Sequence, residues 1–527
     1  MEPPKDSNFS VPLKDLSLTE SNFNDLFSQL REAVLAKKPI LKEILVRHGA
    51  KKLYDYARDY IDVNLNPPIQ KRQDDFLAVI RKEVVRTLGD EVADSVIRQL
   101  SKHYFVSTAD HLGPLTHAFF INSNLLMNAP YAESGSRELE NVIVLACANV
   151  SLNNSSFPRG IVLHSLGKDG KTHYNGLSFS SAQYRLCPVY GFKAYNEADL
   201  KRMQDTIKLK VKEGEMSQPV ATQLGDLIKD TYGNPEVLKC TTYADQVTKT
   251  NYDLWKKLMK SGGNTVKSNL VYLGIEKLVT DLILAYHLDQ DTTVNHFLFD
   301  PNCYPMIHHY FQGITGTYSL LEQWGTYMFW ALPKGSKYRE QLWKVGNNLQ
   351  TKDGSYSLPL TPEGVRKALE SGQLIPSTML IYTVLSFYYG LKCLGGFSQV
   401  NYLTYMKNAY IKMQVDRGMY KSIEVCARAQ TKELVGDVNV AFLRLPDGEL
   451  APATGIDLLL YGQPNWWDCF VKQSKNISLD EAMNPMMPEL YNIIYGEDTD
   501  PRFDPLTTRE IARFTGLQKK IEPCALL

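Results

Sequence analysis

Three side chains that could move a proton or bind a metal ion lie within one short stretch of the chain, residues 107–117. Asp110 and His111 precede a Gly-Pro turn, and His117 follows it. Two of the ten histidines in this chain of 527 residues therefore flank one turn beside a carboxylate. Imidazole and carboxyl groups are common general acids and bases, so the clustering predicts a catalytic site at Asp110, His111 and His117.

Three interpretations of this cluster remain open. In the first, Asp110, His111 and His117 converge with His164, and with His173 as a further candidate, on a divalent cation such as zinc, iron or manganese. In the second, no metal takes part, and one histidine shuttles a proton while Asp110 orients it. In the third, all of these residues are structural: the aspartate caps a helix and the histidines are satisfied by hydrogen bonds. The chain contains no HExxH motif.

Polar and cationic side chains around the cluster are candidates for holding a substrate. Two asparagines follow it directly, and an arginine lies in a loop of small polar residues at 153–160. Backbone N–H groups and a guanidinium in such a loop suit a phosphate or a carboxylate. The predicted substrate-binding residues are Asn122, Asn124, Arg159, His164 and Arg185.

A β-hairpin is expected to bring two more histidines together. Residues 159–166 and 171–178 have strand character, and Asp169-Gly170 between them is a strong hairpin signal. A hairpin closed there pairs Lys168 with Lys171, which places Leu166 opposite His173 and His164 opposite Asn175. The two histidines are then diagonal neighbours on one face, roughly 7 to 8 Å apart.

The elements that must position the cluster follow from local patterns. Pro114 is suited to the first position of a helix that continues through Leu125, which places His117 one turn inside that helix. Residues 141–149 form a continuous apolar run typical of a strand buried on both faces. Residues 361–372 have a capping Thr361, a following proline and a closing glycine, so they predict a helix. Gly395-Gly396 marks a place where the backbone could approach a ligand.

The order of these patterns predicts an α+β fold. We expect it to be helix-rich, with a small mixed or antiparallel central sheet and a large α-helical remainder. The chain divides into a flexible lead at 1–20, a helical region at 21–105, a central α/β segment with the candidate site at 106–196, a helical region at 197–350 and a mixed C-terminal region at 351–527. The last three segments could pack as one large domain.

Composition narrows the class of protein. Lys+Arg and Asp+Glu are equal at 58 each, which disfavours a dedicated nucleic-acid binder. Eight scattered cysteines without a CxxC pair, and a polar start without signal-peptide features, favour the cytoplasm. The uncharged run at 374–391 is marginal in length and is expected to be a buried helix rather than a membrane span. The final residues, Cys524 to Leu527, match a prenylation box in form, but no polybasic run supports it.

Several motifs of common enzymes are absent from the sequence. It contains no GxSxG elbow, no GxxxxGK[ST] loop and no GxGxxG after a strand, so no nucleotide cofactor is expected. The sequence predicts an enzyme that acts on a small polar or anionic metabolite through an Asp/His site, with a divalent metal as an open alternative. A non-catalytic helical interaction protein with structural histidines is the alternative from another class. The oligomeric state is not predicted.

Overall fold

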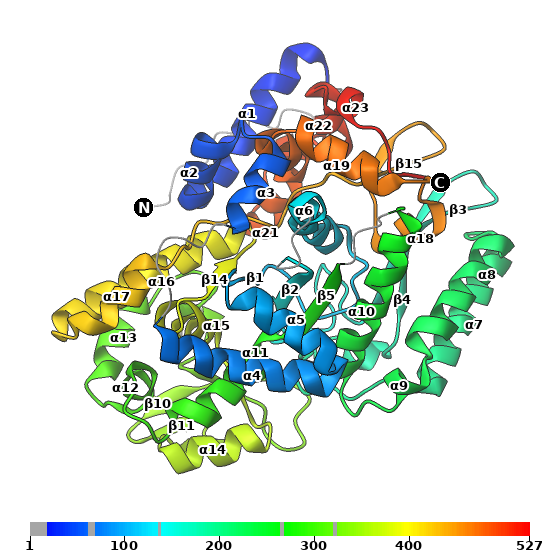
Figure 1. Ribbon diagram of the computed structural model, residues 1–527. Helices are drawn as coiled ribbons and strands as arrows, with labels where there is room; N and C mark the ends of the chain where they lie inside the picture. Colours follow the sequence, from blue (N-terminus) through cyan, green and yellow to red (C-terminus); the bar gives the residue numbers. More distant parts are fainter. Residues whose placement is uncertain (1–17, 62–68, 135–138, 264–267, 320–323) are drawn as a thin grey trace, which may run out of the picture.

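A four-stranded parallel sheet lies at the centre of the helix-rich chain in the computed structural model (Figure 1), which describes residues 18–61, 69–134, 139–263, 268–319 and 324–527. Its strands, in spatial order, are β14 (Lys392–Leu394), β1 (Phe105–Ser107), β2 (Asn141–Ala146) and β5 (Asn269–Gly274). All neighbouring strands are parallel. The prediction of a helix-rich fold that combines helices with small sheets is confirmed, whereas the prediction of a mixed or antiparallel central sheet is wrong.

The central strands are largely apolar because helices cover both faces of the sheet. Alternate side chains of β2 enter two different cores: Val142 and Val144 pack into the first, and Ile143 and Leu145 into the second. Side chains alternate between the two faces of a strand, so each strand joins the two cores. The buried strand predicted at 141–149 is confirmed as β2, and the continuous run reflects burial on both sides.

Helices from distant parts of the chain form the two outer layers. The first core lies against helices that include α1 (Glu20–Lys37), α2 (Pro39–His48), α3 (Leu53–Ile61), α6 (Ala118–Ser134), α7 (Glu197–Glu213), α10 (Tyr243–Ser261), α18 (Gly455–Tyr461), α19 (Trp466–Asn476) and α21 (Met487–Tyr495). The second lies against helices that include α4 (Gln70–Leu88), α5 (Asp90–Leu100), α11 (Ile275–Leu282), α12 (Thr293–Phe299), α13 (Cys303–Phe311), α14 (Pro362–Glu370) and α15 (Thr378–Tyr382). The long helix α16 (Phe397–Asp416) contributes to both.

The path of the chain through the sheet reverses direction once. From β1 the chain passes through α6 to β2 and through α10 to β5, with both helices on the first core. From β5 it passes through α11 and α15 on the second core and returns as β14, on the other side of β1. The carboxyl ends of β1 and β14 therefore lie at a topological switch point, where open α/β sheets commonly bind ligands.

The predicted hairpin forms, but its register differs by one residue. β3 (Gly160–Leu166) pairs with β4 (Thr172–Ser178) so that His164 faces Tyr174 and Ser165 faces His173. The turn uses one more residue than predicted: the Gly170 N–H donates to the Gly167 carbonyl, and Gly170 takes a left-handed φ of 75°. A type I turn followed by such a glycine makes a three-residue loop. His164 and His173 therefore lie on opposite faces, and their predicted proximity is wrong.

The chain from 361 to 391 contains one regular helix followed by an irregular buried segment. Helix α14 is confirmed, and the Thr361 hydroxyl accepts a hydrogen bond from the Gly364 N–H as its cap. The uncharged run at 374–391 is buried but irregular, since β13 (Leu374–Pro376), α15 and the π-helix η4 (Thr383–Tyr388) divide it. None of the described helices is both long and apolar enough to cross a membrane. The predicted flexible lead at 1–20 lies largely outside the described residues.

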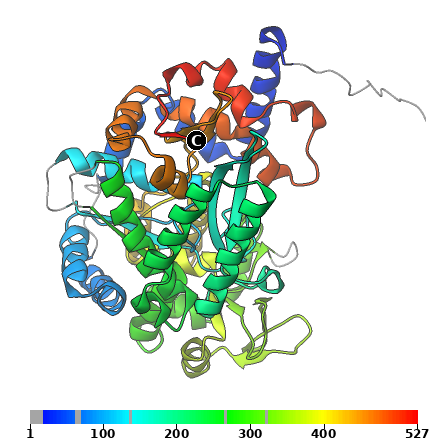
Figure 2. The ribbon, with the colours of Figure 1, turned by 90° about the vertical axis from the view of Figure 1, so that its right-hand side faces the viewer.

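The remaining strands form small sheets around the periphery. The C-terminal strand β17 (Ala525–Leu526) pairs with β15 (Phe442–Arg444), so Cys524 is buried beside that pairing. The other described strands are β6 (Tyr318–Ser319), β7 (Trp324–Gly325), β8 (Phe329–Ala331), β9 (Glu340–Gln341), β10 (Trp343–Val345), β11 (Asn348–Gln350), β12 (Ser357–Pro359) and β16 (Leu450–Pro452). Figure 2 shows the β3–β4 hairpin and the neighbouring α7 on the side that faces the viewer.

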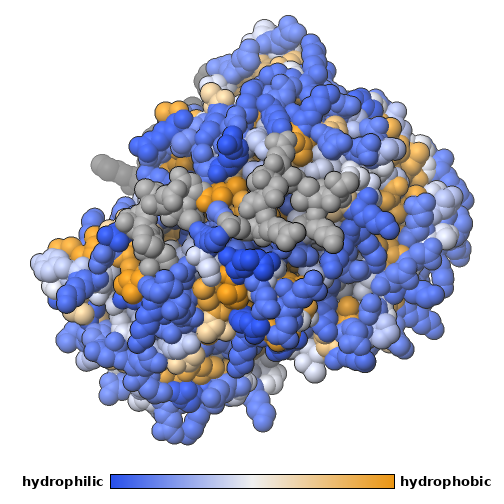
Figure 3. All heavy atoms as spheres, in the orientation of Figure 1, coloured by the Kyte–Doolittle hydropathy of each residue, from blue (hydrophilic) through white to orange (hydrophobic). Residues whose placement is uncertain are grey.

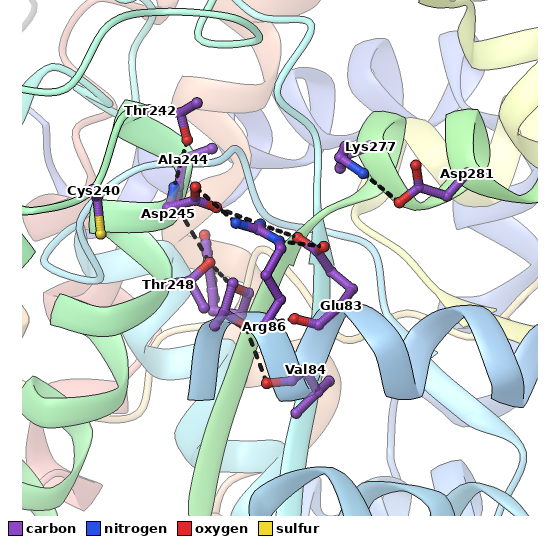
Figure 4. A network of polar contacts seen from close by, with 12 residues as sticks. Glu83, Val84, Arg86, Cys240, Thr242, Ala244, Asp245, Thr248, Lys277 and Asp281 are labelled. Atoms are coloured by element: carbon purple, nitrogen blue, oxygen red, sulfur yellow. Dashed lines mark hydrogen bonds and ion pairs between the residues drawn. The ribbon is translucent and has the colours of Figure 1, made fainter. Parts of the chain in front are cut away.

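An arginine-centred network joins the two helix layers beside β5. Arg86 on α4 donates to both oxygens of Glu83 (2.6 and 2.9 Å) and to both oxygens of Asp245 in the first turn of α10 (2.6 and 3.0 Å; Figure 4). The two carboxylates raise the pKa of Arg86, and the guanidinium holds the pKa of Asp245 below its usual value. Paired bidentate contacts of this kind are stronger than single surface ion pairs.

Candidate functional site

The Asp/His cluster occupies the loop that follows β1, at the topological switch point. The loop begins after Ser107 and ends where α6 starts at Ala118. Its first half extends the pairing with β2, because the Cys147 N–H donates to the Asp110 carbonyl and the Leu112 N–H donates to the Cys147 carbonyl (both 2.8 Å). The cluster therefore lies at the carboxyl edge of the sheet.

The second half of this loop is not helical, which corrects the predicted helix start at Pro114. The side chain of Asn251 on α10 accepts from the Leu115 N–H (2.8 Å) and donates to the Gly113 carbonyl (3.0 Å). The Gly455 N–H donates to the Thr116 carbonyl (2.9 Å). These tertiary hydrogen bonds satisfy the backbone in a turn, so the helix begins only at Ala118.

Asp110 is completely buried, and its two oxygens have different surroundings. Its Oδ2 accepts a hydrogen bond from the Asn124 side chain of α6 (2.8 Å). Its Oδ1 has no hydrogen-bond partner among the described residues. Burial raises the pKa of Asp110 to about 7, although the side chains of Asn124 and Tyr272 oppose the shift. A carboxyl that costs this much to ionise is half protonated near neutral pH.

His117 lies at the start of α6 rather than one turn inside it. Its carbonyl accepts from the Ile121 N–H (3.1 Å), and its Nδ1 accepts from the Phe119 N–H (3.4 Å), so it caps the helix. Burial, and then the neighbouring His111, lower the pKa of His117 to about 4. The imidazole is therefore neutral at pH 7, and part of its surface remains exposed.

The side chain of His111 makes hydrogen-bond contacts with the loop at 153–160. Its Nδ1 lies 3.3 Å from the Asn154 side-chain oxygen and 3.1 Å from the Ser156 hydroxyl. Burial lowers the pKa of His111. The same loop also packs closely against Gly113. A Cβ at this position would lie 2.7 Å from Pro158 Cα, so a larger residue would not fit without a shift. The cluster and the loop at 153–160 are therefore in direct contact.

The predicted substrate-binding residues do not converge on the cluster. Asn124 contacts Asp110, but the Asn122 oxygen accepts from the N–H groups of Val440 and Ala441 (2.8 and 2.7 Å) and so ties α6 to the C-terminal region. Arg159 lines a separate cavity, and Arg185 is exposed. Of the predicted substrate-binding residues, Asn124 is therefore the one that contacts the Asp110 carboxyl.

His164 has its own carboxylate partner. Its Nδ1 lies 2.7 Å from Asp457 Oδ2, and its backbone N–H donates to the other oxygen of Asp457 (2.8 Å). Asp457 is fully buried in the first turn of α18. His173 lies on the other face of the hairpin, with Nε2 3.5 Å from Asp169. Among the described residues, no group of three or more His, Cys, Asp or Glu side chains is arranged to hold a metal ion.

Two further carboxyl groups near the switch point were not anticipated. Asp437 accepts a hydrogen bond from the Phe397 N–H (2.7 Å) at the start of α16, directly after Gly395-Gly396. Burial raises the pKa of Asp437 to about 6. Burial and then the charge of Asp437 raise the pKa of Glu489 to about 7. Asp437 has a left-handed φ of 65°, a conformation that Asp adopts more readily than most residues.

A third unanticipated carboxyl, Glu276, organises the ends of β2 and β5. It is fully buried in the first turn of α11 and accepts from the N–H groups of Ala148 (2.7 Å) and Asn149 (2.8 Å). The Cys147 thiol also donates to it (3.3 Å), and Glu276 contributes to raising the pKa of that thiol after burial itself. The thiol is therefore held protonated, which argues against a nucleophilic role.

Comparisons with known proteins add no family to this description. No protein-family model matches the chain, and no curated protein matches it significantly.

Proposed function

We propose that this protein is an enzyme that acts on a small polar or anionic metabolite by metal-free proton transfer at Asp110. The observation that carries the proposal is the position of this fully buried carboxyl at the switch point, with one oxygen held by Asn124 and the Tyr272 side chain close by. A pKa of about 7 lets the group exchange a proton at neutral pH.

His117 is the second group in the proposed chemistry. Its pKa of about 4 keeps it neutral where Asp110 is still protonated. Pairs of titratable groups whose surroundings separate their pKa values are typical of acid–base assignments in enzymes. We assign proton donation to Asp110 and proton acceptance to His117, while His111 positions the loop at 153–160.

Metabolite conversion tests this proposal. A mixture of small polar metabolites is incubated with the wild type and with Asp110→Asn, and untargeted mass spectrometry records what is consumed. We expect the wild type to convert at least one component and the variant to do so about 100-fold more slowly. Asp205→Asn, an exposed carboxylate on α7, is the matched control and keeps full conversion. Conversion that is absent in the wild type, or equal in Asp110→Asn, would contradict the proposal.

A large groove supports the second candidate function, a non-catalytic interaction protein. The groove, of about 1,370 Å³, runs between α1, the end of α13, α16 and the end of α21. Lys37, Lys38 and Lys412 line it together with tyrosines, which suits an acidic partner. The face in Figure 3 is mostly hydrophilic, with hydrophobic residues in small separate patches. A Lys38→Glu/Lys412→Glu variant that loses a partner kept by Asp110→Asn would favour this candidate.

A further inference from the structure

A cavity of about 220 Å³ lies beside the β3–β4 hairpin and is separate from the Asp/His cluster. It is open to solvent on part of its surface and is lined by the residues before β3, by the segment after β4 and by the first turns of α7 and α10. Arg159 lies just before β3, Phe179 lies just after β4, and Arg202 lies on α7. As the structure describes it, the lining includes none of Asp110, His111 and His117.

Aromatic rings form the walls of this cavity. Phe179 and Tyr195 stack with ring centroids 4.6 Å apart and planes 13° from parallel. Tyr184 and Phe192 meet edge to face at 5.6 Å on another side. The Tyr195 and Tyr243 hydroxyls donate to the carbonyls of Tyr232 (3.0 Å) and Pro158 (2.5 Å). These hydroxyls are engaged by the protein, so the rings offer mainly apolar surface to an occupant.

Positive charge at the cavity is not balanced by the protein. Arg202 is committed to the Phe179 carbonyl (2.5 Å) and to Asp199 (2.9 Å), the one carboxylate in the lining as described. Arg159 lies over the Phe157 ring at 5.0 Å and, within the described chain, forms no ion pair; its buried Nε has no hydrogen-bond partner. Burial and the nearby Arg185 lower the pKa of Arg159. A guanidinium in this setting favours an anion.

Two serines add hydrogen-bond donors at the same place. The hydroxyls of Ser180 and Ser181 are buried and have no partner among the described residues. Both serines line the cavity directly after Phe179. Buried hydroxyls are normally satisfied, so two neighbouring free ones beside an unpaired arginine indicate a missing acceptor.

We propose that this cavity binds a small organic anion that contains one flat ring. The ring packs between the aromatic walls, and the anionic group accepts hydrogen bonds from Arg159, Ser180 and Ser181. The volume lies below the roughly 300 to 1,000 Å³ of sites for drug-sized ligands, which limits the occupant to a small metabolite. This site goes beyond the proposed proton transfer and does not depend on it.

Isothermal titration calorimetry of the full-length protein tests the proposal, with benzoate as the ring-bearing anion and inorganic phosphate as the anion without a ring. We expect benzoate to bind more tightly than phosphate. Arg159→Gln should weaken benzoate binding by about tenfold or more, and Arg159→Lys should weaken it less. Lys201→Gln, an exposed lysine on α7, is the matched control and should leave binding unchanged. Asp110→Asn should also bind benzoate normally, which separates this site from the proposed catalytic one.

Three results would overturn the proposal. They are no benzoate binding at millimolar concentration, phosphate binding as tight as benzoate binding, and an Arg159→Gln variant with unchanged affinity. If Arg159→Gln does not fold, the Ser180→Ala/Ser181→Ala double variant replaces it. Removal of two hydroxyl donors should weaken benzoate binding several-fold, and unchanged affinity would refute the assignment.

Discussion

Replacing Asp110 by Asn should change how the stability of the protein depends on pH. The carboxyl is fully buried, and its pKa is about 7 in the folded protein, against an ordinary value of 3.8. The folded state therefore holds this proton more tightly than the unfolded state does. Raising the pH from about 4 to about 7 favours unfolding of the wild type, whereas Asn at this position cannot titrate.

The size of the effect follows from the two pKa values of Asp110. They differ by about three pH units, and each unit corresponds to 1.36 kcal/mol, so ionisation of Asp110 costs about 4 kcal/mol above pH 7. Part of that cost is already present at pH 5, where the unfolded carboxyl is ionised. Between pH 5 and pH 8 the wild type should lose about 2 to 3 kcal/mol relative to Asp110→Asn.

Urea unfolding of both proteins from pH 5 to pH 8 measures this difference. Loss or gain of a hydrogen bond to Asn124 shifts the variant by a constant amount, and other titrating groups are common to both proteins. The quantity to follow is therefore the change in the stability difference with pH. A difference that stays constant across this range would refute the argument that Asp110 is protonated near neutral pH.

Two structural contacts give further expectations. Arg86→Met should lower the free energy of unfolding by about 1 to 3 kcal/mol, because it leaves two mostly buried carboxylates without their partner. Arg81→Met, which removes an exposed ion pair, should lower it by less than about 1 kcal/mol. Equal losses for the two variants in urea unfolding would contradict this expectation. Gly113→Ala should destabilise by about 1 to 3 kcal/mol in thermal unfolding, because its Cβ meets Pro158, whereas Gly225→Ala, in open space, should be neutral or stabilising.

Local patterns in the sequence predicted the elements that depend on neighbouring residues. The apolar run of β2, the capped helix α14 and the existence of the β3–β4 hairpin all follow from such signals. The parallel direction of the central sheet did not follow. It depends on how β1, β2, β5 and β14 assemble from positions nearly 300 residues apart, and no local pattern encodes that assembly.

At the candidate site, too, local sequence patterns predicted local features but not the contacts between distant segments. The clustering of Asp110, His111 and His117 was visible in the sequence, and the contact of Asp110 with Asn124 lies within one loop and helix. The start of α6 was misplaced because Asn251, 136 residues away from Leu115, holds the preceding turn. The hairpin register was wrong because one left-handed glycine lengthened the loop. Asp437, Glu489 and Glu276 reach the sheet edge only through tertiary packing.

The pH dependence of kcat/KM, for the first metabolite that the wild type converts, tests the central claim most directly. If protonated Asp110 donates and neutral His117 accepts, kcat/KM should be level between about pH 5 and pH 6 and fall above about pH 7, as the carboxyl ionises. A value of kcat/KM that rises through pH 7, or that shows no change there, would contradict the assignment of Asp110 as the proton donor.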